Sequence, residues 1–442
     1  MKKMLILSGL FFNKKGNQSF LNSVKGYDKE YDVTLVTAAT MNSDVYISKE
    51  KANEFIPNLK IVSLINPRVI DFGKKIVGFL RKNRQNATCE FNDNQSPKVD
   101  GIVNLPPTKS SYVSFYFRSF LIVLYSFFYY LKNRPDVVCC YEINAVRACV
   151  LLKKVFGAKV FIKLQGTALG GSLGNLEDKD VKKTFAIDIL ELKKSYVFDG
   201  AIMTNDGTLG DKVLQYYGYT SDKILFINNG IEPRFTLPTV ISEVMEKRKS
   251  ERLRNNINFV VVSRLTSWKR IDLVLECIAK MKDVDSRDIS LTLIGVGCGS
   301  EYEYYHRLIE KLNIEDSVEF IHGAPTEDVV DCILKSDFLL SLNKYTNVSN
   351  PVFESLYLST PVITIEQPDL VSVIGPGEHG CIFLPNGTNE EILEAFVNKV
   401  SKVNYQQYTS LLNYYDSYIE HFPTWEKRSS FELEFLNSKV LF

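Results

Sequence analysis

The chain has 442 residues, enough for two or three domains, and two is the natural expectation at this length. Hydrophobic residues make up 45% and charged residues 24%, as in soluble globular proteins, and a formal net charge of +1 gives no global sign of nucleic-acid binding. Eight cysteines without a Cys-x-x-Cys pair and four scattered histidines favour free thiols in a reducing, cytoplasmic compartment and argue against a metal site.

The N-terminal half alternates strands with helices. Residues 4–8 are an apolar run of strand length, and residues 16–26 can hold a helix. This start lacks the small-residue cleavage site of a signal peptide, so we expect a first strand there. Further strands are expected at residues 32–37, 136–141, 159–164 and 200–204. Buried runs between helical spans predict a parallel sheet covered on both faces, with residues 81–107 as a long loop.

The apolar segment 115–131 admits two interpretations. It is shorter than the roughly 20 residues that a spanning helix needs, and Arg118 interrupts it, which favours a helix packed under the sheet. The alternative is a patch that dips into a membrane interface. Nearby tyrosines and basic residues support that alternative: Tyr125, Tyr129, Tyr130, Lys132 and Arg134, with Lys74, Lys75, Arg81, Lys82 and Arg84. We therefore expect weak peripheral binding to an anionic membrane.

A second series of strands and helices begins near Asn258. Its strands are expected at residues 258–263, 290–295, 318–323, 338–342 and 361–365, with a helix after each of the first four. Two complete series predict an α/β chain of two Rossmann-like domains that face a cleft, an N-terminal one at 1–228 and a C-terminal one at 229–424. The charged residues 243–256 are expected to form a solvated helix.

Two cations follow the first strand of the second series. Arg264 and Lys269 are five residues apart, and ligands bind at the carboxyl ends of parallel strands. Together they can hold a diphosphate, the arginine as a planar fork and the lysine as a point charge. A solvated basic loop before a helix is the alternative interpretation.

A glycine-bearing turn follows the next strand. Gly295 and Gly297 let the backbone approach an anion at a helix N-terminus, although Ser300 replaces the last glycine of the dinucleotide fingerprint. By itself this pattern is a weak indication of phosphate binding.

A third helix start lies at residues 349–356. Pro351 suits the first turn of a helix, and the amides of Val352 and Phe353 then point toward the crevice that holds the two cations. Glu354 lies in that turn, where its carboxylate can chelate two ribose hydroxyls. A glutamate favoured only by the helix dipole is the alternative.

These motifs occur in one order along the chain, and the set resembles the retaining glycosyltransferases of family 4, which have the GT-B fold. The residues that carry the resemblance are Asn229-Gly230-Ile231-Glu232-Pro233-Arg234-Phe235, Arg264 and Lys269, Gly295-Val296-Gly297, Phe320-Ile321-His322-Gly323, Asn350 to Glu354 with Thr360-Pro361-Val362-Ile363, and Thr424-Trp425-Glu426-Lys427-Arg428. The resemblance covers most of residues 200–435 and the first domain only loosely. It implies that a helix at about 425–442 packs back on the first domain.

The resemblance implies roles for the residues that match. Arg264 and Lys269 would hold the donor diphosphate and stabilise the leaving group, and Glu354 would bind the ribose. The other nucleotide contacts that it implies are Gly16, Gly295, Gly297, Gly323, Ala324, Asn350, Val352 and Phe353, with the base near Gly323 and Ala324. No metal or other cofactor is expected, because the two cations supply the electrostatic stabilisation.

Two departures from the family concern the donor-sugar side. Thr346 stands where the family usually carries a glutamate, eight positions before the ribose glutamate, and Gln165 stands where many members carry a histidine. Amides and hydroxyls at these places can still bond sugar hydroxyls. The candidates for sugar or acceptor contacts are Glu142, Gln165, Gly166, Thr167, Thr346 and Asn347.

The implied reaction moves a hexose or N-acetylhexosamine from a nucleoside-diphosphate sugar to an acceptor hydroxyl with retention, and we expect the nucleotide to be UDP. The implied setting is bacterial surface-polysaccharide or glycan assembly on a glycan or lipid-linked acceptor, at the inner face of the cell membrane. A catalytically silent subunit that binds nucleotide sugars and a nucleotide-sugar epimerase are the alternatives. A nicotinamide-dependent oxidoreductase is disfavoured because residues 13–17 lack the glycine fingerprint.

Overall fold

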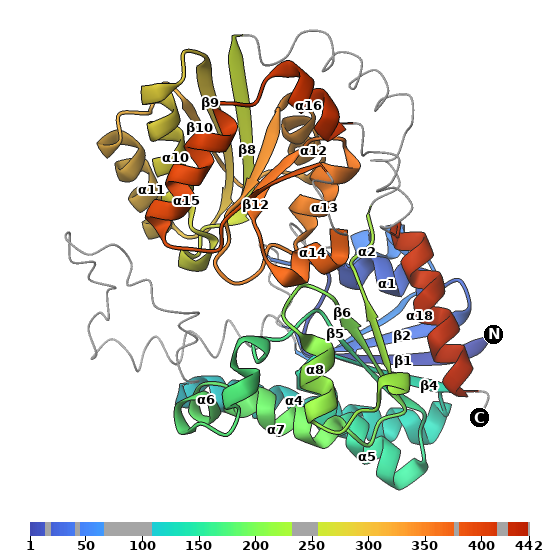
Figure 1. Ribbon diagram of the computed structural model, residues 1–442. Helices are drawn as coiled ribbons and strands as arrows, with labels where there is room; N and C mark the ends of the chain where they lie inside the picture. Colours follow the sequence, from blue (N-terminus) through green and yellow to red (C-terminus); the bar gives the residue numbers. More distant parts are fainter. Residues whose placement is uncertain are drawn as a thin grey trace, which may run out of the picture. The chain divides into compact units, whose positions relative to one another are not determined.

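The computed structural model describes residues 1–13, 19–39, 45–65, 108–231, 255–374, 380–412 and 423–440. The chain divides into two compact units, Met1–Asn229 with Trp425–Phe442 and Gly230–Thr424. Each unit contains one parallel sheet (Figure 1). Gly16, residues 81–107 and most of the predicted helix at 243–256 lie outside the described ranges, as do Lys74 and Lys75.

The N-terminal unit is built on a seven-stranded sheet in the order β3-β2-β1-β4-β5-β6-β7, with every neighbouring pair parallel. The strands predicted from the apolar runs are confirmed. The bounds are β1 Lys2–Ser8, β2 Tyr31–Thr37, β3 Lys60–Ser63, β4 Val137–Tyr141, β5 Val160–Leu164, β6 Gly200–Thr204 and β7 Ile224–Ile227. Every residue of β4, β5 and β6 is buried, as in a sheet covered on both faces.

Alternate side chains of β1 enter two different cores, one on each face of this sheet. Leu5 and Leu7 pack in one core, and Met4 and Ile6 pack in the other. The first core is covered by α4 Lys109–Asn133, α5 Val146–Phe156, α7 Ala186–Ser195 and α8 Gly210–Tyr216 (Figure 1). The second is covered by α1 Ser19–Tyr27, α2 Lys49–Phe55 and the C-terminal helix α18 Trp425–Val440. The short α6 Lys179–Thr184 precedes α7.

A buried polar cluster attaches α18 to the N-terminal sheet. Glu432 of α18 forms an ion pair with Lys163 of β5 and accepts hydrogen bonds from Arg428 Nε at 2.9 Å and from the Tyr27 hydroxyl at 2.5 Å. Lys163, Glu432 and Arg428 are completely buried. Burial alone would raise the pKa of Glu432, but the charges of Lys163 and Arg428 outweigh it and lower that pKa to about 2. The carboxylate is therefore ionised inside the unit.

The C-terminal unit is built on a six-stranded parallel sheet in the order β10-β9-β8-β11-β12-β13. The strands are β8 Asn256–Arg264, β9 Asp288–Val296, β10 Val318–His322, β11 Phe338–Ser341, β12 Val362–Ile365 and β13 Cys381–Leu384. One face is covered by α10 Ile271–Val284, α11 Gly299–Lys311, α15 Asn389–Val400 and α16 Tyr405–Leu412, the other by α12 Thr326–Lys335, α13 Asn350–Tyr357 and α14 Pro368–Ile374. The strand order reverses between β8 and β11, which is where doubly wound sheets bind ligands.

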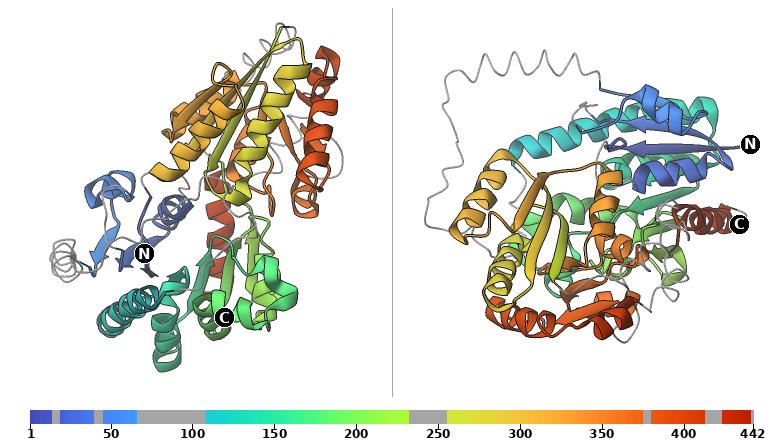
Figure 2. Two further views of the ribbon diagram at one scale, coloured as in Figure 1. Left: turned by 90° about the vertical axis from the view of Figure 1, so that its left-hand side faces the viewer. Right: turned by 90° about the horizontal axis from the view of Figure 1, so that it is seen from above.

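The helix predicted over residues 115–131 is confirmed and is longer than predicted, because α4 runs from Lys109 to Asn133. The Thr108 side chain caps its N-terminus by accepting from Ser111 N at 3.2 Å. Within the described ranges one segment, Ser110–Asn133, is long and apolar enough to cross a membrane by length and composition. In both views of Figure 2 this helix, drawn in cyan, lies on the outside of its unit.

Candidate functional site

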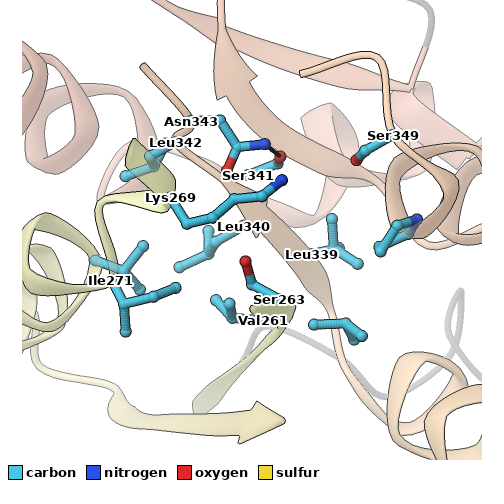
Figure 3. Close-up of a pocket in the computed structure, with 13 residues that line it drawn as sticks. Val261, Ser263, Lys269, Ile271, Leu339, Leu340, Ser341, Leu342, Asn343 and Ser349 are labelled. Carbon is cyan, nitrogen blue, oxygen red and sulfur yellow. Dashed lines mark hydrogen bonds between the residues drawn. The ribbon is translucent and has the colours of Figure 1, made fainter. Parts of the chain in front are cut away.

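A small pocket lies at the reversal point of the C-terminal sheet, between the carboxyl ends of β8 and β11 (Figure 3). Ser263 comes from β8, Ser341 and Asn343 come from the end of β11 and the loop after it, and Ser349 and Pro351 come from the start of α13. Lys269 also lines the pocket, and Figure 3 shows its side chain reaching across toward the Ser341–Asn343 pair. The sheet order therefore brings together two stretches that are distant in sequence, residues 261–274 and residues 339–351.

Lys269 is placed by a tight turn after β8. Residues Ser267–Lys269 form a single 3-10 turn, in which Lys269 N donates to Thr266 O at 2.9 Å, and Arg270 takes the left-handed conformation at φ 51°. The Lys269 ammonium lies 4.1 Å from the centre of the Trp268 ring. Burial, together with the charge of Arg264, lowers the pKa of Lys269 to about 8. Arg264, at the end of β8, is exposed. The result is a pair of cations, one of them partly desolvated, at the ligand-binding edge.

The loop after β11 is held by the side chain of Asn347, which is completely buried. Asn347 Oδ1 accepts from Ser341 Oγ at 2.8 Å and from Asn343 N at 3.1 Å, and Nδ2 donates to Asn343 O and to Gln367 Oε1. This amide has no capacity left for a sugar hydroxyl. Its position fixes the loop, so we leave Asn347 out of the proposed sugar contacts.

The Thr346 side chain in the same loop binds a carboxylate. Its hydroxyl donates to Asp369 Oδ2 at 2.8 Å and accepts from Val348 N at 3.1 Å. Asp369 lies in the first turn of α14, just beyond β12, and burial raises its pKa against the lowering effect of the Thr346 hydrogen bond. It forms no ion pair with any residue that the structure describes. Asp369 was not among the residues expected at the site, and its only signal in the sequence was its place shortly after the strand predicted at 361–365.

The N-terminus of α13 adjoins the same pocket. Pro351 occupies the first turn, and Val352 and Phe353 are buried behind it. Phe353 N donates to Ser349 O at 3.2 Å, so this amide is already engaged. Asn350 and Glu354 are half-buried. Sequence reasoning thus placed this helix start correctly, and the pocket brings Ser349 and Pro351 together with Lys269.

The glycines of the second predicted turn leave room for neighbouring side chains. A Cβ at Gly295 would lie 2.7 Å from Leu265 Cδ2, and one at Gly297 would lie 2.6 Å from Glu301 Oε2. Gly297 N already donates to the Tyr302 hydroxyl at 3.1 Å. This bond occupies a donor that the sequence analysis assigned to a phosphate. Gly323 takes φ 71° directly after β10, with Ala324 half-buried beside it.

The candidates of the N-terminal unit lie together at the carboxyl ends of β4, β5 and β6. Gln165 N donates to Glu142 Oε1 at 3.0 Å, and Thr167 N donates to Thr208 Oγ1 at 3.0 Å. Gly166 takes φ 136°, and a Cβ there would lie 1.9 Å from Asp206 Oδ2, so the position requires glycine. Glu142 itself has φ 62°, an unusual value for a residue with a side chain, and such backbone strain clusters at ligand sites.

Burial raises the pKa of Glu142 to about 7, with Asp188 and Asp206 adding to the rise and the Gln165 amide opposing it. An acid whose pKa is higher in the folded than in the unfolded chain costs stability as pH rises through the interval between the two values. We therefore expect the free energy of unfolding of Glu142→Gln, relative to that of the wild type, to be higher at pH 8 than at pH 5. Urea unfolding of both proteins at the two pH values measures this difference. The exposed Glu303→Gln is the control, and an equal difference at the two pH values would contradict the assignment.

Comparison with known families supplies the decisive observation. Residues 244–410 match the family of glycosyl transferases group 1. The matched segment contains Arg264, Lys269 and Glu354 with the whole of the pocket described above. The C-terminal unit therefore contains a segment similar to the glycosyl transferases of group 1, and this segment covers less than half of the chain. A search of curated proteins by sequence found no match.

Solved structures resemble the whole chain at low sequence identity. HepE of Anabaena, in complex with UDP, is 13% identical with a TM-score of 0.64, covering 98% of this chain and 99% of its own. Sucrose-phosphate synthase of Thermosynechococcus elongatus is 13% identical with a TM-score of 0.66, covering 100% and 99%. The catalytic domain of starch synthase IV of Arabidopsis thaliana, bound to ADP and acarbose, is 11% identical with a TM-score of 0.62, covering all of both chains. The predicted GT-B fold is confirmed.

Proposed function

We propose that this protein is a glycosyltransferase that moves a hexose or N-acetylhexosamine from a UDP-sugar to an acceptor hydroxyl, with retention of the anomeric configuration. The observation that carries the proposal is the position of Lys269, a partly desolvated cation in a pocket shared with the N-terminus of α13. A cation and a helix N-terminus at the reversal point of a doubly wound sheet suit a diphosphate. The choice of UDP is supported by HepE, whose structure was solved with UDP and with UDP-glucose.

Each residue has a place in this proposal. Lys269 and Arg264 neutralise the diphosphate, most strongly when the bond from the sugar C1 to the phosphate oxygen breaks and negative charge accumulates on the leaving group. The acceptor oxygen forms the new bond to C1 on the same face, and its proton passes to the departing phosphate oxygen. Glu354 binds the ribose hydroxyls. The remaining nucleotide contacts in the proposal are Asn350, the Val352 amide, the backbone at Gly323 and Ala324, and Gly16, which lies outside the described residues.

We propose that no resident metal takes part, since the two cations can stabilise the leaving diphosphate. Among the described residues no three His, Cys, Asp or Glu side chains gather as metal ligands do. Adding a chelator to the transfer assay tests the point. Turnover that disappears with the chelator and returns with a divalent cation would contradict the proposal.

The direct test of function is donor binding followed by turnover. A thermal-shift screen of nucleoside diphosphates and their sugars should raise the melting temperature most with the UDP series. Incubation with a labelled UDP-sugar and a glycan acceptor, followed by NMR of the product, reports the anomeric configuration. Inversion would contradict the retaining mechanism, and no response to any nucleotide would contradict donor binding. Binding without turnover would favour a catalytically silent subunit, an alternative that the threonine at position 346 suggests.

On the sugar side we propose that Asp369 provides a carboxylate that Thr346 itself lacks. Asp369 is half-buried and has no cation partner among the described residues, and such a partly desolvated carboxylate is a strong acceptor for donor-sugar hydroxyls. Thr346 would then fix the carboxylate through the 2.8 Å hydrogen bond.

Replacing Asp369 with asparagine is expected to leave the affinity for UDP unchanged and to lower the affinity for the UDP-sugar by about 10- to 100-fold, the effect of losing one charged hydrogen bond. Calorimetric titration with UDP and with the UDP-sugar selected by the screen measures the two affinities separately. The exposed Asp283→Asn provides the matched control. Equal losses for UDP and for the sugar nucleotide would assign Asp369 a purely structural role.

We propose further that the acceptor belongs to bacterial surface-polysaccharide or glycan assembly and that the protein works in the cytoplasm, at the inner face of the cell membrane. Cell fractionation under gentle and high-salt conditions tests the location. Recovery of the protein outside the cytoplasmic and inner-membrane fractions would contradict it.

A further inference from the structure

Helix α4 exposes a continuous apolar stripe. Six large hydrophobic side chains between 44% and 69% exposed follow one another at intervals of three or four residues: Val113, Phe117, Phe120, Leu124, Phe128 and Leu131. This spacing puts all six on one face of the helix. Over 18 residues at a rise of about 1.5 Å, the stripe is about 27 Å long. Scattered apolar side chains are ordinary on a protein surface, but a row of this length marks an interaction surface.

The opposite face of α4 is anchored in its own unit. Phe115, Ile122 and Tyr130 are buried, and Ser119 Oγ donates to Asn144 O at 2.9 Å. The Tyr129 hydroxyl donates to Thr34 Oγ1 of β2 at 2.9 Å. A helix held to the sheet in this way cannot leave it to span a bilayer. The stripe is therefore placed to lie along a surface. Of the tyrosines expected at that surface, Tyr130 is buried, whereas Tyr129 is half-buried and lines a hollow beside the stripe.

The charged residues of α4 and its two caps are all basic. From Thr108 to Arg134 the chain carries Lys109, Arg118, Lys132 and Arg134 and no acidic residue. Lys132 and Arg134 are exposed at the C-terminal end of the stripe. A surface that is apolar along its centre and basic at its margin complements a layer of anionic headgroups over acyl chains.

A hollow of about 710 Å³ adjoins the stripe. Its wall is mostly apolar and aromatic, with Leu64, Leu121, Leu124, Tyr125 and Phe128 among the lining residues, and Lys132 also lines it. The volume lies within the range of small-molecule sites. An apolar wall next to a lysine suits an acyl chain below an anionic headgroup.

We propose that α4 binds the surface of an anionic lipid bilayer, with the six side chains inserted at the boundary between headgroups and acyl chains. A second copy of this chain is a poorer occupant. Two copies meeting through α4 about a twofold axis would bring its basic residues together without an acidic residue on either helix. The proposal does not depend on the glycosyl-transfer reaction, because vesicle binding is measured without substrates.

The test is sedimentation of the full chain with vesicles of phosphatidylcholine containing about 30% phosphatidylglycerol, an anionic lipid. The wild type should sediment with them at low salt and less with pure phosphatidylcholine vesicles. The double variant Phe120→Glu with Phe128→Glu should lower the vesicle partition coefficient at least about tenfold. Phe55→Glu with Val284→Glu is the matched control, since it introduces the same charges at exposed hydrophobic positions elsewhere.

The Phe120→Glu with Phe128→Glu variant should keep the wild-type melting temperature, since both side chains are exposed. Val113→Glu with Leu131→Glu, at the two ends of the stripe, is a second double variant. High salt should weaken binding without abolishing it, because the apolar contribution persists. Unchanged sedimentation of both folded double variants would overturn the proposal. A wild type that does not sediment with anionic vesicles would also overturn the proposal. Light scattering would then distinguish a dimer that the variants dissociate from a monomer, in which another part of the chain would cover the stripe.

Discussion

Replacing Lys269 with alanine is expected to lower kcat for glycosyl transfer by about 10²- to 10³-fold, the loss typical of removing one group that stabilises developing charge. The Lys269 ammonium is partly removed from water, so its field at a leaving diphosphate is weakly screened. Stability should change little, because its contact with Trp268 is a single cation–π interaction near the surface. Initial rates at saturating donor, with a thermal melt of the same preparation, measure both.

The matched control is Lys280→Ala, an exposed lysine on α10. Arg264→Ala should also lower transfer strongly, since Arg264 is the second cation of the pair. Because the protonated lysine is the active form, kcat/KM should fall as pH rises through about 8, the pKa of Lys269 in the free protein. Near-wild-type turnover in Lys269→Ala would remove the lysine from the proposed mechanism.

Replacing Glu432 with alanine is expected to destabilise the N-terminal unit by about 3–5 kcal/mol, the cost of leaving buried charges without their partner. Glu432 neutralises Lys163 and Arg428 and accepts from the Tyr27 hydroxyl, all inside the protein. Its loss would leave two cations in a completely buried site. Urea unfolding at neutral pH, with a probe on the N-terminal unit, measures the change.

Glu426 on the same helix provides the control, because its ion pair with Lys29 at 2.6 Å is exposed and Glu426→Ala should leave the stability nearly unchanged. The pH dependence has a defined sign. The folded pKa of Glu432, about 2, lies below that of an unfolded glutamate, so its contribution is complete above about pH 5 and is lost as pH falls toward 2. A difference between wild type and Glu432→Ala that stays constant over that interval would contradict the ion pair.

Several parts of the fold and site could be predicted because their signals are local. Apolar runs such as residues 4–8 and 258–263 identified strands buried on both faces, and the alternation with helices identified parallel sheets. Since ligands bind at the carboxyl ends of such strands, Lys269 and the start of α13 could be assigned to one site from the sequence alone. Sequence position was sufficient here because the carboxyl ends of parallel strands all lie at the same edge of the sheet.

Other features depend on pairings that no local pattern contains. Thr346 and Asp369 are 23 residues apart and meet only because β11 and β12 are neighbours, while Asn347 turned inward to fix its loop. The apolar segment 115–131 by itself could not tell its buried side chains from its exposed ones, since Phe occurs on both faces of α4. The sequence by itself determined the strands, their parallel arrangement and the segment after β8 that carries the two cations. The tertiary structure alone decided which polar side chains are already bonded and which apolar face is left exposed, because both depend on neighbours brought together by packing.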